Sequence, residues 1–537
     1  MIYNRKDCKI CEHGIYYIEY CIFLRQFQKF LKTLGIHRRI TCRRVFGGFY
    51  TAPFPAQLLS ETGEKYRVNL NGDDFSVFLF LKLSLLTTEM EDIMSDDCKD
   101  LQLMDKIVSL CKRRGFIFPS SEIYGGFNGF WDYGPYGSRM KRAIENLWWH
   151  EMVETRDNVE GLDSTIICNP TVWKASGHLD QFSDLMTDCK DCKARHRVDQ
   201  MEDPTTCPNC KSKNLTEPKE FNLMMKTFVG PVFDDEHVAY LRAETCQPIF
   251  VDFHSVRIAA RQKLPFGIAQ IGKAFRNEIN PRNFTFRSRE FTQMEMEFFC
   301  EDEGSMEWFE YWKEQRIKYY REKLGFPEDR MRIYEHEKLA HYAKAAVDIE
   351  VKFPFGWGEL EGIHHRGVWD LSQHSKFSGQ DLSYVDHDNQ RKIMPTCVET
   401  SVGLDRTFLA LLSMAYDEES AATQKAGMDE DVRVVLHLPP LVAPIQVAVL
   451  PQSKKLKENA YKLYKDLDRH FRCEYDETGS IGKRYRRQDE IGTPFCVTFD
   501  FDTENDNAVT IRDRDTMQQE RVNISQLRAC LEEKIGF

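Results

Sequence analysis

Four cysteines in two close pairs place the tightest constraint on how this chain can fold. Cys189 and Cys192 form one pair, Cys207 and Cys210 form the other, and fourteen residues separate the pairs. Two thiolate pairs on two tight turns can close a tetrahedron around one zinc ion. Because protein sulfur would fill all four positions, the spacing predicts a structural zinc in an insertion over residues 183–230. The alternative is four reduced cysteines in a flexible insertion.

The composition is that of a globular protein. With 537 residues the chain exceeds one ordinary domain, so two or three are expected. No apolar run approaches the eighteen residues of a membrane span. The net charge of −11 excludes a generally cationic nucleic-acid coat but leaves room for a local basic patch. Seventeen cysteines are too sparse for a disulfide scaffold and favour a reducing compartment.

Residues 1–93 differ from the rest because they are slightly basic and rich in aromatic side chains. Apolar residues at helical spacing predict a helix from Tyr16 to Leu34. Three interpretations stay open for this N-terminal extension: a genuine part of the protein, a mitochondrial targeting segment, or a start codon assigned too early. In the last case Met90 or Met94 would be the real start.

The region from 94 to 430 is predicted to form one large domain. Its pattern predicts helices over 101–114 and 141–154, short strands between 232 and 300, a strand-like stretch over 356–371, a strand that becomes a helix over 396–414, and a polar linker over 417–431. Strands then alternate with helices over residues 440–537. That alternation predicts a small α/β domain with a mixed sheet.

Two segments carry residue types suited to a nucleoside triphosphate. The stretch from 275 to 295 reads as two antiparallel strands, and strand alternation would put Arg276 and Glu278 on one face. An arginine can hold a phosphate with two donors and stays charged, while Phe291 could stack under a purine. Near 403 a strand ends and a helix begins, with Arg406 in its first turn. That places a cation and free backbone N–H groups near a polyphosphate.

These segments, with the Trp131–Pro135 stretch ahead of a long helix, resemble the three signature motifs of class II aminoacyl-tRNA synthetases. More narrowly, the chain is similar to the dimeric glycyl-tRNA synthetases over about residues 100–537. The phrases that carry this are GFNGFWDYGPYG (126–137), LRAET (241–245), residues 275–299, GWGELEGI (356–363), residues 399–406 and IGKRYRRQDEIGTP (481–494). The resemblance implies an α/β (α+β) fold: an antiparallel sheet flanked by helices, a zinc-ribbon-like insertion and a C-terminal α/β anticodon-binding domain.

The resemblance also implies roles for the ATP site. Arg276 would hold the α-phosphate, Glu278 would contact the adenine, Phe291 would stack on it, and Arg406 would hold the γ-phosphate. Arg276 and Arg406 are thus the predicted catalytic residues. The other residues in ATP-contacting segments are Asn277, Phe286, Arg287, Arg289, Glu359, Leu360, Gly403 and Asp405. Mg²⁺ bridging the phosphates is expected, and no protein general base is assigned.

A second implied site takes glycine, which offers an ammonium, a carboxylate and no side chain. Carboxylates should surround the ammonium, and close walls should exclude larger amino acids, so no editing domain is required. The implied residues are Arg197, Glu244, Phe291, Gln293, Glu295, Glu399, Ser401 and Gly403. The pair His364–His365 is unusual for the family and is interpreted as ordinary packing or surface histidines.

The implied activity is ATP-dependent formation of glycyl-adenylate and transfer of glycine to the 3′ end of tRNA(Gly). The basic cluster Lys483, Arg484, Arg486 and Arg487 is the predicted tRNA contact, and Tyr485 within it is expected to be packed. A cytoplasmic homodimer is expected, with Pro135 at the interface. Two alternatives remain: a ligase for serine, threonine or proline, and an inactive synthetase-like RNA-binding subunit. The presence of both phosphate-holding arginines disfavours the second.

Overall fold

The computed structural model describes residues 58–59, 65–66, 102–198, 201, 203–337, 339, 343–386, 388–420 and 432–536. The chain divides into two compact units, Met1–Asp92 and Ile93–Phe537. In the first, β1 (Leu58–Leu59) and β2 (Lys65–Tyr66) pair antiparallel. The helix predicted for Tyr16–Leu34 lies outside the described residues. The interpretation of residues 1–93 therefore stays a prediction.

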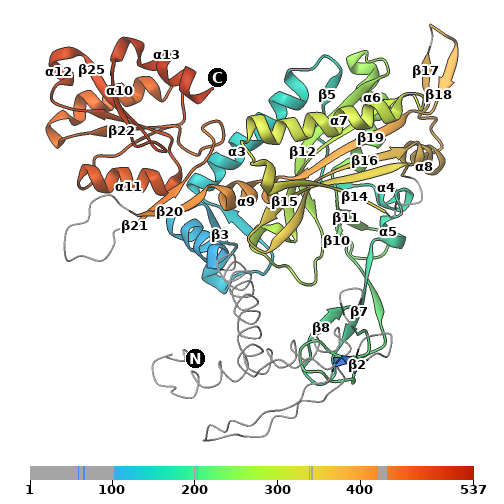
Figure 1. Ribbon diagram of the computed structural model, residues 1–537. Coiled ribbons are helices and arrows are strands. Elements are labelled where there is room, and N and C mark those ends of the chain that lie inside the picture. Colours follow the sequence, from blue (N-terminus) through green and yellow to red (C-terminus); the bar gives the residue numbers. More distant parts are fainter. Residues whose placement is uncertain are drawn as a thin grey trace, which may run out of the picture. The chain divides into compact units, whose positions relative to one another are not determined.

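A seven-stranded sheet forms the centre of the second unit (Figure 1). Its strands, in spatial order, are β14 (Met331–Glu335), β15 (Ala345–Phe353), β16 (Gly356–Gly367), β19 (Thr396–Gly403), β13 (Glu290–Cys300), β12 (Phe266–Phe275) and β5 (Val159–Gly161). Every neighbouring pair is antiparallel except β12 with β5. The predicted antiparallel sheet is thus confirmed, with β5 as a parallel edge strand.

Helices flank this sheet and contribute apolar side chains to the buried cores around it. They are a helix over residues 102–114, α3 (Pro135–Trp149), α6 (Cys246–Ala260), α7 (Ser305–Lys318), α8 (Trp369–Ser378) and α9 (Leu404–Ala415). Helix α7 packs on β16 and β19, and α9 packs on β13 and β19. Trp148 of α3 and Trp312 of α7 are fully buried in the main core. The rigid sheet can therefore hold side chains in fixed rows.

The insertion is a small module of its own. Strands β7 (Ser183–Asp188), β8 (Arg195–Arg197) and β9 (Lys219–Asn222) form a sheet in the order β8-β7-β9. A second small sheet has the order β10 (Met225–Phe228), β11 (Val238–Leu241) and β6 (Ile167–Cys168), so it joins strands from before and after the first sheet in the chain. The short helices α4 (Pro170–Ala175) and α5 (His178–Gln181) precede the module in the chain.

The C-terminal region carries the predicted mixed sheet, in the order β23-β22-β24-β25-β26. The strands are β22 (Val447–Pro451), β23 (Cys473–Tyr475), β24 (Phe495–Phe499), β25 (Ala508–Asp513) and β26 (Gln519–Asn523), and the main helices are α10 (Lys457–Leu467), α11 (Ile481–Ile491) and α13 (Ile524–Ile535). Strand β22 pairs parallel with β23 and β24, and the remaining pairs are antiparallel. Among the described residues, no helix has the length and apolar character needed to cross a bilayer.

Some predicted elements are wrong in detail. The stretch 232–300 holds a fifteen-residue helix, α6, where only strands were expected, because an apolar run that is buried on most sides reads the same in both states. The predicted linker begins as a strand, β20 (Tyr416–Ser420), which pairs with β21 (Val432–Leu436). Residues 421–431 lie outside the described part. Strand β12 ends at Phe275, so Arg276 and Glu278 lie in the following loop rather than on a strand face.

Candidate active site and zinc cluster

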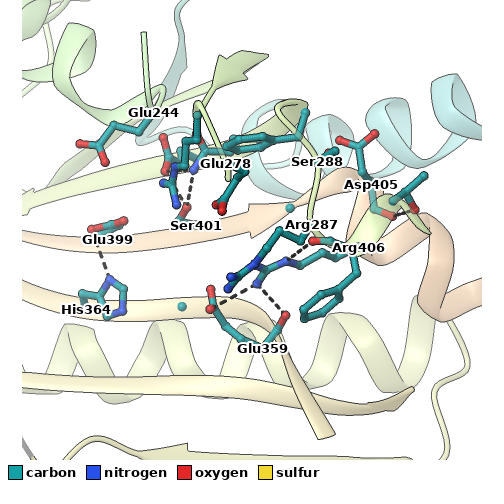
Figure 2. A pocket seen from close by; sticks show the side chains of 18 of the residues that line it. Glu244, Glu278, Arg287, Ser288, Glu359, His364, Glu399, Ser401, Asp405 and Arg406 are labelled. Atoms are coloured by element: carbon teal, nitrogen blue, oxygen red, sulfur yellow. Dashed lines mark hydrogen bonds and ion pairs between the residues drawn. The ribbon is translucent and has the colours of Figure 1, made fainter. Parts of the chain in front are cut away.

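The candidate active site is a pocket of about 410 Å³ over the middle strands of the large sheet. Strand register explains why its polar residues meet: Glu295 of β13 lies opposite Ser401 of β19, and Ser401 lies opposite Gly362 of β16. Because side chains alternate along a strand, every second residue of each strand faces the pocket. Figure 2 shows Glu244 and Glu399 toward one end and Arg406 and Glu359 toward the other. The pocket thus has an acidic end and an end with paired charges.

Glu295 lies at the centre of the acidic end and is 1% exposed. Its carboxylate accepts hydrogen bonds from the Ser401 hydroxyl at 2.5 Å, from the Gln293 amide at 2.9 Å and from the Thr245 hydroxyl. Burial, together with the nearby Glu399, raises the pKa of Glu295 to about 7. This carboxyl is therefore poised to change charge when a cation enters the pocket.

Glu399 is held between an arginine and a histidine. Arg366 Nη1 donates to its Oε2 at 2.7 Å, and His364 Nδ1 lies 3.4 Å from the same oxygen (Figure 2 shows the histidine contact). Burial alone would raise the pKa of Glu399, but Arg366 lowers it to about 2. Burial would lower the pKa of His364, whereas Glu399 raises it above its ordinary value. Glu399 is consequently a fixed negative charge.

Glu244 closes the acidic end from the loop before α6. His178 Nε2 lies 3.2 Å from its Oε2, and the Gln247 amide donates to its Oε1 at 3.1 Å. Burial opposes ionisation, but the facing His178 lowers the pKa of Glu244 below its ordinary value. Two ionised glutamates and one easily ionised glutamate thus surround a small space, which suits an ammonium group.

Arg276 lines the pocket, and its charge helps to lower the pKa of a carboxyl at each end, Glu244 and Glu359. Its Nε donates to the carbonyl oxygen of Ala243 at 3.1 Å, and its guanidinium carbon lies 5.4 Å from the ring centres of Phe291 and Phe182. This is the one hydrogen bond that its side chain makes to the described residues. Held at one nitrogen and flanked by rings, the guanidinium retains two terminal groups that can bind an anion.

Arg406 anchors the opposite end from the first turn of α9. It pairs with the Glu359 carboxylate at 3.2 Å, donates to the Glu359 carbonyl at 2.9 Å and lies 4.4 Å over the Phe286 ring (Figure 2). The Arg406 charge lowers the pKa of Glu359 below its ordinary value. A guanidinium with a half-exposed carboxylate partner can exchange that partner for a phosphate.

Asp405 lines the pocket, but its carboxylate is already occupied. Tyr133 donates to Oδ1, and the backbone N–H of Thr292 donates to Oδ2 at 2.6 Å. Tyr133 comes from β4 (Trp131–Tyr133), so the bond connects the segment before α3 to the start of α9. The carboxylate thus fixes the helix that carries Arg406.

The structure brings most of the predicted ligand-contacting residues to this one pocket. Those lining it are Glu244, Arg276, Glu278, Phe286, Arg287, Phe291, Gln293, Glu295, Glu359, Glu399, Ser401, Gly403, Asp405 and Arg406. The others lie around it or away from it. Asn277 and Arg289 brace the loop through backbone contacts, Leu360 is buried at 1% exposure, and Arg197 lies on β8, where it pairs with Asp184 at 3.2 Å.

Sequence reasoning missed several residues of the lining: Thr285, Ser288, Gly362, His364 and Arg366. The packing interpretation holds for His365, which is fully buried with Nε2 2.8 Å from the Ser305 hydroxyl, but not for His364. Gly362, His364 and Arg366 are alternate residues of β16. The period of two along the predicted strand was the signal that could have found them.

The four paired cysteines come together as predicted. Cys189 Sγ lies 3.6 Å from Cys210 Sγ, and Cys192 Sγ lies 3.7 Å from Cys207 Sγ. All four sulfurs are within 4.8 Å of one another. Zinc–sulfur bonds of about 2.3 Å in a tetrahedron place sulfurs about 3.8 Å apart, so this donor set fits Zn²⁺. All four positions are sulfur, which makes the site structural in character.

The two cysteine turns have the same backbone form. Lys193 N donates to Cys189 O at 2.9 Å, and Lys211 N donates to Cys207 O at 2.9 Å. Both lysines have left-handed backbone angles, with φ of 61° and 62°. Each turn thereby presents its two thiols to a common centre.

The basic cluster on α11 is only partly available to RNA. Lys483 is exposed, and Arg486 is half-buried and donates to the Val432 carbonyl at 3.0 Å. Arg487 pairs with Asp476 at 2.5 Å. Arg484 is 4% exposed and donates to two backbone carbonyls, so the expectation that it contacts RNA does not fit this placement. Tyr485 is packed as expected, with its hydroxyl 2.6 Å from that of Thr498.

Comparison with known families agrees with this geometry. Residues 229–415 match the profile described as "tRNA synthetase class II core domain (G, H, P, S and T)", and residues 446–534 match "Anticodon binding domain". The sheet, the pocket and these matches define a class II aminoacyl-tRNA synthetase.

Close relatives narrow the class further. Glycine–tRNA ligases of Caldanaerobacter subterraneus and Geobacillus kaustophilus are each 50% identical over 463 residues, which cover 81% of this chain and 99% of the relative. The ligase of Clostridium perfringens is 50% identical over 464 residues, with the same coverage. The chain belongs to the glycine–tRNA ligase family.

Proposed function

We propose that this chain activates glycine with ATP as glycyl-adenylate in the pocket, and then transfers glycine to the 3′ end of tRNA(Gly). The observation that carries the proposal is the division of charge: carboxylates suited to an ammonium lie at one end, and arginines suited to phosphates lie at the other. Family membership supports glycine over serine, threonine and proline as the amino acid.

In the first step the glycine carboxylate attacks the α-phosphorus of ATP, and pyrophosphate leaves. Glu244, Glu295 and Glu399 bind the ammonium, with Ser401 and Gln293 orienting Glu295. Arg276 offsets the repulsion between carboxylate and phosphate, Phe291 stacks on the adenine, and Arg406 binds the γ-phosphate. Mg²⁺ accompanies the phosphates, and Glu359 is the acidic side chain beside Arg406. No protein group is needed as a general base.

In the second step a hydroxyl of the terminal ribose of the tRNA attacks the carbonyl carbon of the adenylate, so that the glycyl ester forms and AMP leaves. We assign anticodon recognition to residues 440–537, with Lys483, Arg486 and Arg487 toward the phosphate backbone. Arg484 supports the fold of α11 instead. The catalytic domain is assigned to residues 94–430, with the zinc module at 183–230.

The proposal includes a homodimer in the cytoplasm. Ile123, Tyr124 and Phe127 support a protein contact, since they are 61–88% exposed on the loop between β3 (Ile117–Pro119) and β4. That loop precedes Pro135, the predicted interface residue. The four-thiolate cluster supports a reducing compartment.

Amino-acid-dependent ATP–pyrophosphate exchange across all twenty amino acids tests the function. We expect exchange with glycine alone, and equal rates in the full chain and in a chain that starts at Met94. Exchange with a different amino acid would keep the fold and overturn the substrate. No exchange from folded, zinc-replete protein would favour the inactive-subunit alternative.

Glycine binding should weaken as the pH falls. Since the pKa of Glu295 is raised to about 7, this carboxyl is largely protonated at pH 6 and ionised at pH 8. A cationic ammonium requires the ionised form, so the KM for glycine should be roughly tenfold higher at pH 6 than at pH 8. The KM for ATP serves as the internal reference. In Glu295→Gln the glycine KM should be higher at pH 8 but much flatter with pH; an unchanged slope would remove Glu295 from this role.

A further inference from the structure

A buried glutamine lies between the two glutamates on opposite sides of the acidic end. Gln247 belongs to the first turn of α6 and is 0% exposed. Its Nε2 donates to Glu244 Oε1 and to Asp370 Oδ1, at 3.1 Å each. Asp370 binds Arg366 through both carboxylate oxygens, at 2.8 and 2.9 Å, and Arg366 donates to Glu399. This amide therefore contacts Glu244 directly and is connected to Glu399 through Asp370 and Arg366.

The orientation of this amide follows from the chemistry around it. Carboxylates accept hydrogen bonds, so the NH₂ group must face Glu244 and Asp370, and it has one hydrogen for each. The amide oxygen then needs a donor, and His374 Nε2 lies 2.8 Å from it. Burial lowers the pKa of His374, which favours a neutral ring carrying its proton at Nε2. Both hydrogens of the amide and its oxygen therefore have partners.

The members of this network come from four separate parts of the fold, one of which is β16 with Arg366. Glu244 and Gln247 flank the start of α6, Asp370 and His374 are on α8, and Glu399 is on β19. Asp370 is 2% exposed and His374 is 6% exposed, so both side chains are shielded from bulk solvent. Gln247 is the residue at which α6 and α8 are joined by hydrogen bonds beneath the pocket.

We propose that Gln247 is a positioning residue for the amino acid substrate. It fixes the Glu244 carboxylate directly, and it fixes Glu399 through Asp370 and Arg366, so that both face the ammonium. This rests on the proposed function, because it assumes that the acidic end holds glycine. Gln247 touches neither substrate nor nucleotide, and the hydrogen bonds of Arg276 and Arg406 within the described residues go to other partners. Its loss should therefore affect glycine and not ATP.

Gln247→Met keeps the volume and removes both donors. We expect the KM for glycine in ATP–pyrophosphate exchange to rise roughly tenfold, the size expected for a lost hydrogen bond to a charged group, while the KM for ATP stays within about twofold. Gln446→Met is the matched control. Gln446 is 1% exposed and donates to the Pro440 carbonyl in the C-terminal region, so the change carries a similar structural cost away from the pocket.

Gln247→Glu provides a second test, the pH dependence of the glycine KM, which would not change if Gln247 had a purely structural role. Once ionised, the introduced carboxyl would lie against two carboxylates, whereas its protonated form can donate one hydrogen bond. The glycine KM of this variant should rise less between pH 8 and pH 6 than the KM of the native protein does, because protonation of the introduced carboxyl offsets part of the loss of the Glu295 charge. An unchanged glycine KM in Gln247→Met, or equal rises for glycine and ATP, would overturn the proposal. Absence of glycine exchange in the native protein would instead refute the proposed function.

Discussion

Arg276→Ala is expected to slow glycine-dependent ATP–pyrophosphate exchange by roughly 10²–10³-fold, the usual cost of removing one donor that stabilises charge in the transition state. The glycine carboxylate and the α-phosphate are both negative and must approach within bonding distance. Arg276 is a cation of the pocket lining, fixed by the Ala243 carbonyl and two aromatic rings. The effect should appear mainly in the rate and less in the KM for either substrate.

Two companion variants sharpen this test. Arg276→Lys keeps the positive charge but lacks the planar guanidinium with its paired donors, so this variant should recover only part of the exchange rate. Arg528→Ala removes an exposed arginine that pairs with Glu532 on α13 and should leave exchange unchanged. Binding of tRNA should survive in Arg276→Ala. Equal loss of exchange and tRNA binding would contradict the division of labour between the two ends of the chain.

Local sequence patterns correctly predicted those elements whose type can be recognised from neighbouring residues alone. The strand that becomes a helix near Gly403 was readable because an apolar strand ends at a glycine and a helical repeat begins. The cysteine cluster was readable because its spacing alone sets the geometry. The roles of Arg276 and Arg406 came from the motif resemblance, because the position of a residue in a strand or helix does not reveal what it binds.

The other features of the site depend on contacts between residues far apart in the sequence, and these contacts could not be predicted. Sequence cannot tell that Arg366 meets Glu399, because that contact depends on the register of β16 against β19. Gln247 lay in a stretch interpreted as strand, so its place under the pocket was hidden by the wrong element type. Strand alternation was also applied past the end of the strand, since β12 ends at Phe275, before both Arg276 and Glu278.

Charge runs were the weakest guide. Four basic residues on α11 looked equivalent in sequence, yet Arg484 lies inside and donates to the carbonyls of Pro451 and Gly479. An arginine can be buried when its donors meet backbone oxygens, and a linear pattern does not distinguish this from an exposed phosphate contact.

The zinc module has a physical connection to the active-site loop. Asn277 N donates to Leu223 O at 2.8 Å, just after β9, and Leu223 N donates to Phe182 O at 3.0 Å, just before β7. The Phe182 ring also lies 5.4 Å from the Arg276 guanidinium. The ends of the module therefore hold the loop that carries Arg276. Loss of the metal should therefore disturb the position of Arg276 through these contacts and slow adenylate formation.

Cys207→Ser is accordingly expected to abolish zinc binding and to lower exchange together. Apparent zinc-binding energies of roughly 10 kcal/mol or more are folding energy for so polar a module, so residues 183–230 should become protease-sensitive while the rest resists. Zinc content by elemental analysis should fall from about one per chain to near zero, as with a strong chelator. Cys530→Ser, a half-buried cysteine of α13, is the matched control and should retain the metal. Full exchange activity in zinc-free Cys207→Ser protein would show that the loop holds Arg276 without help from the module.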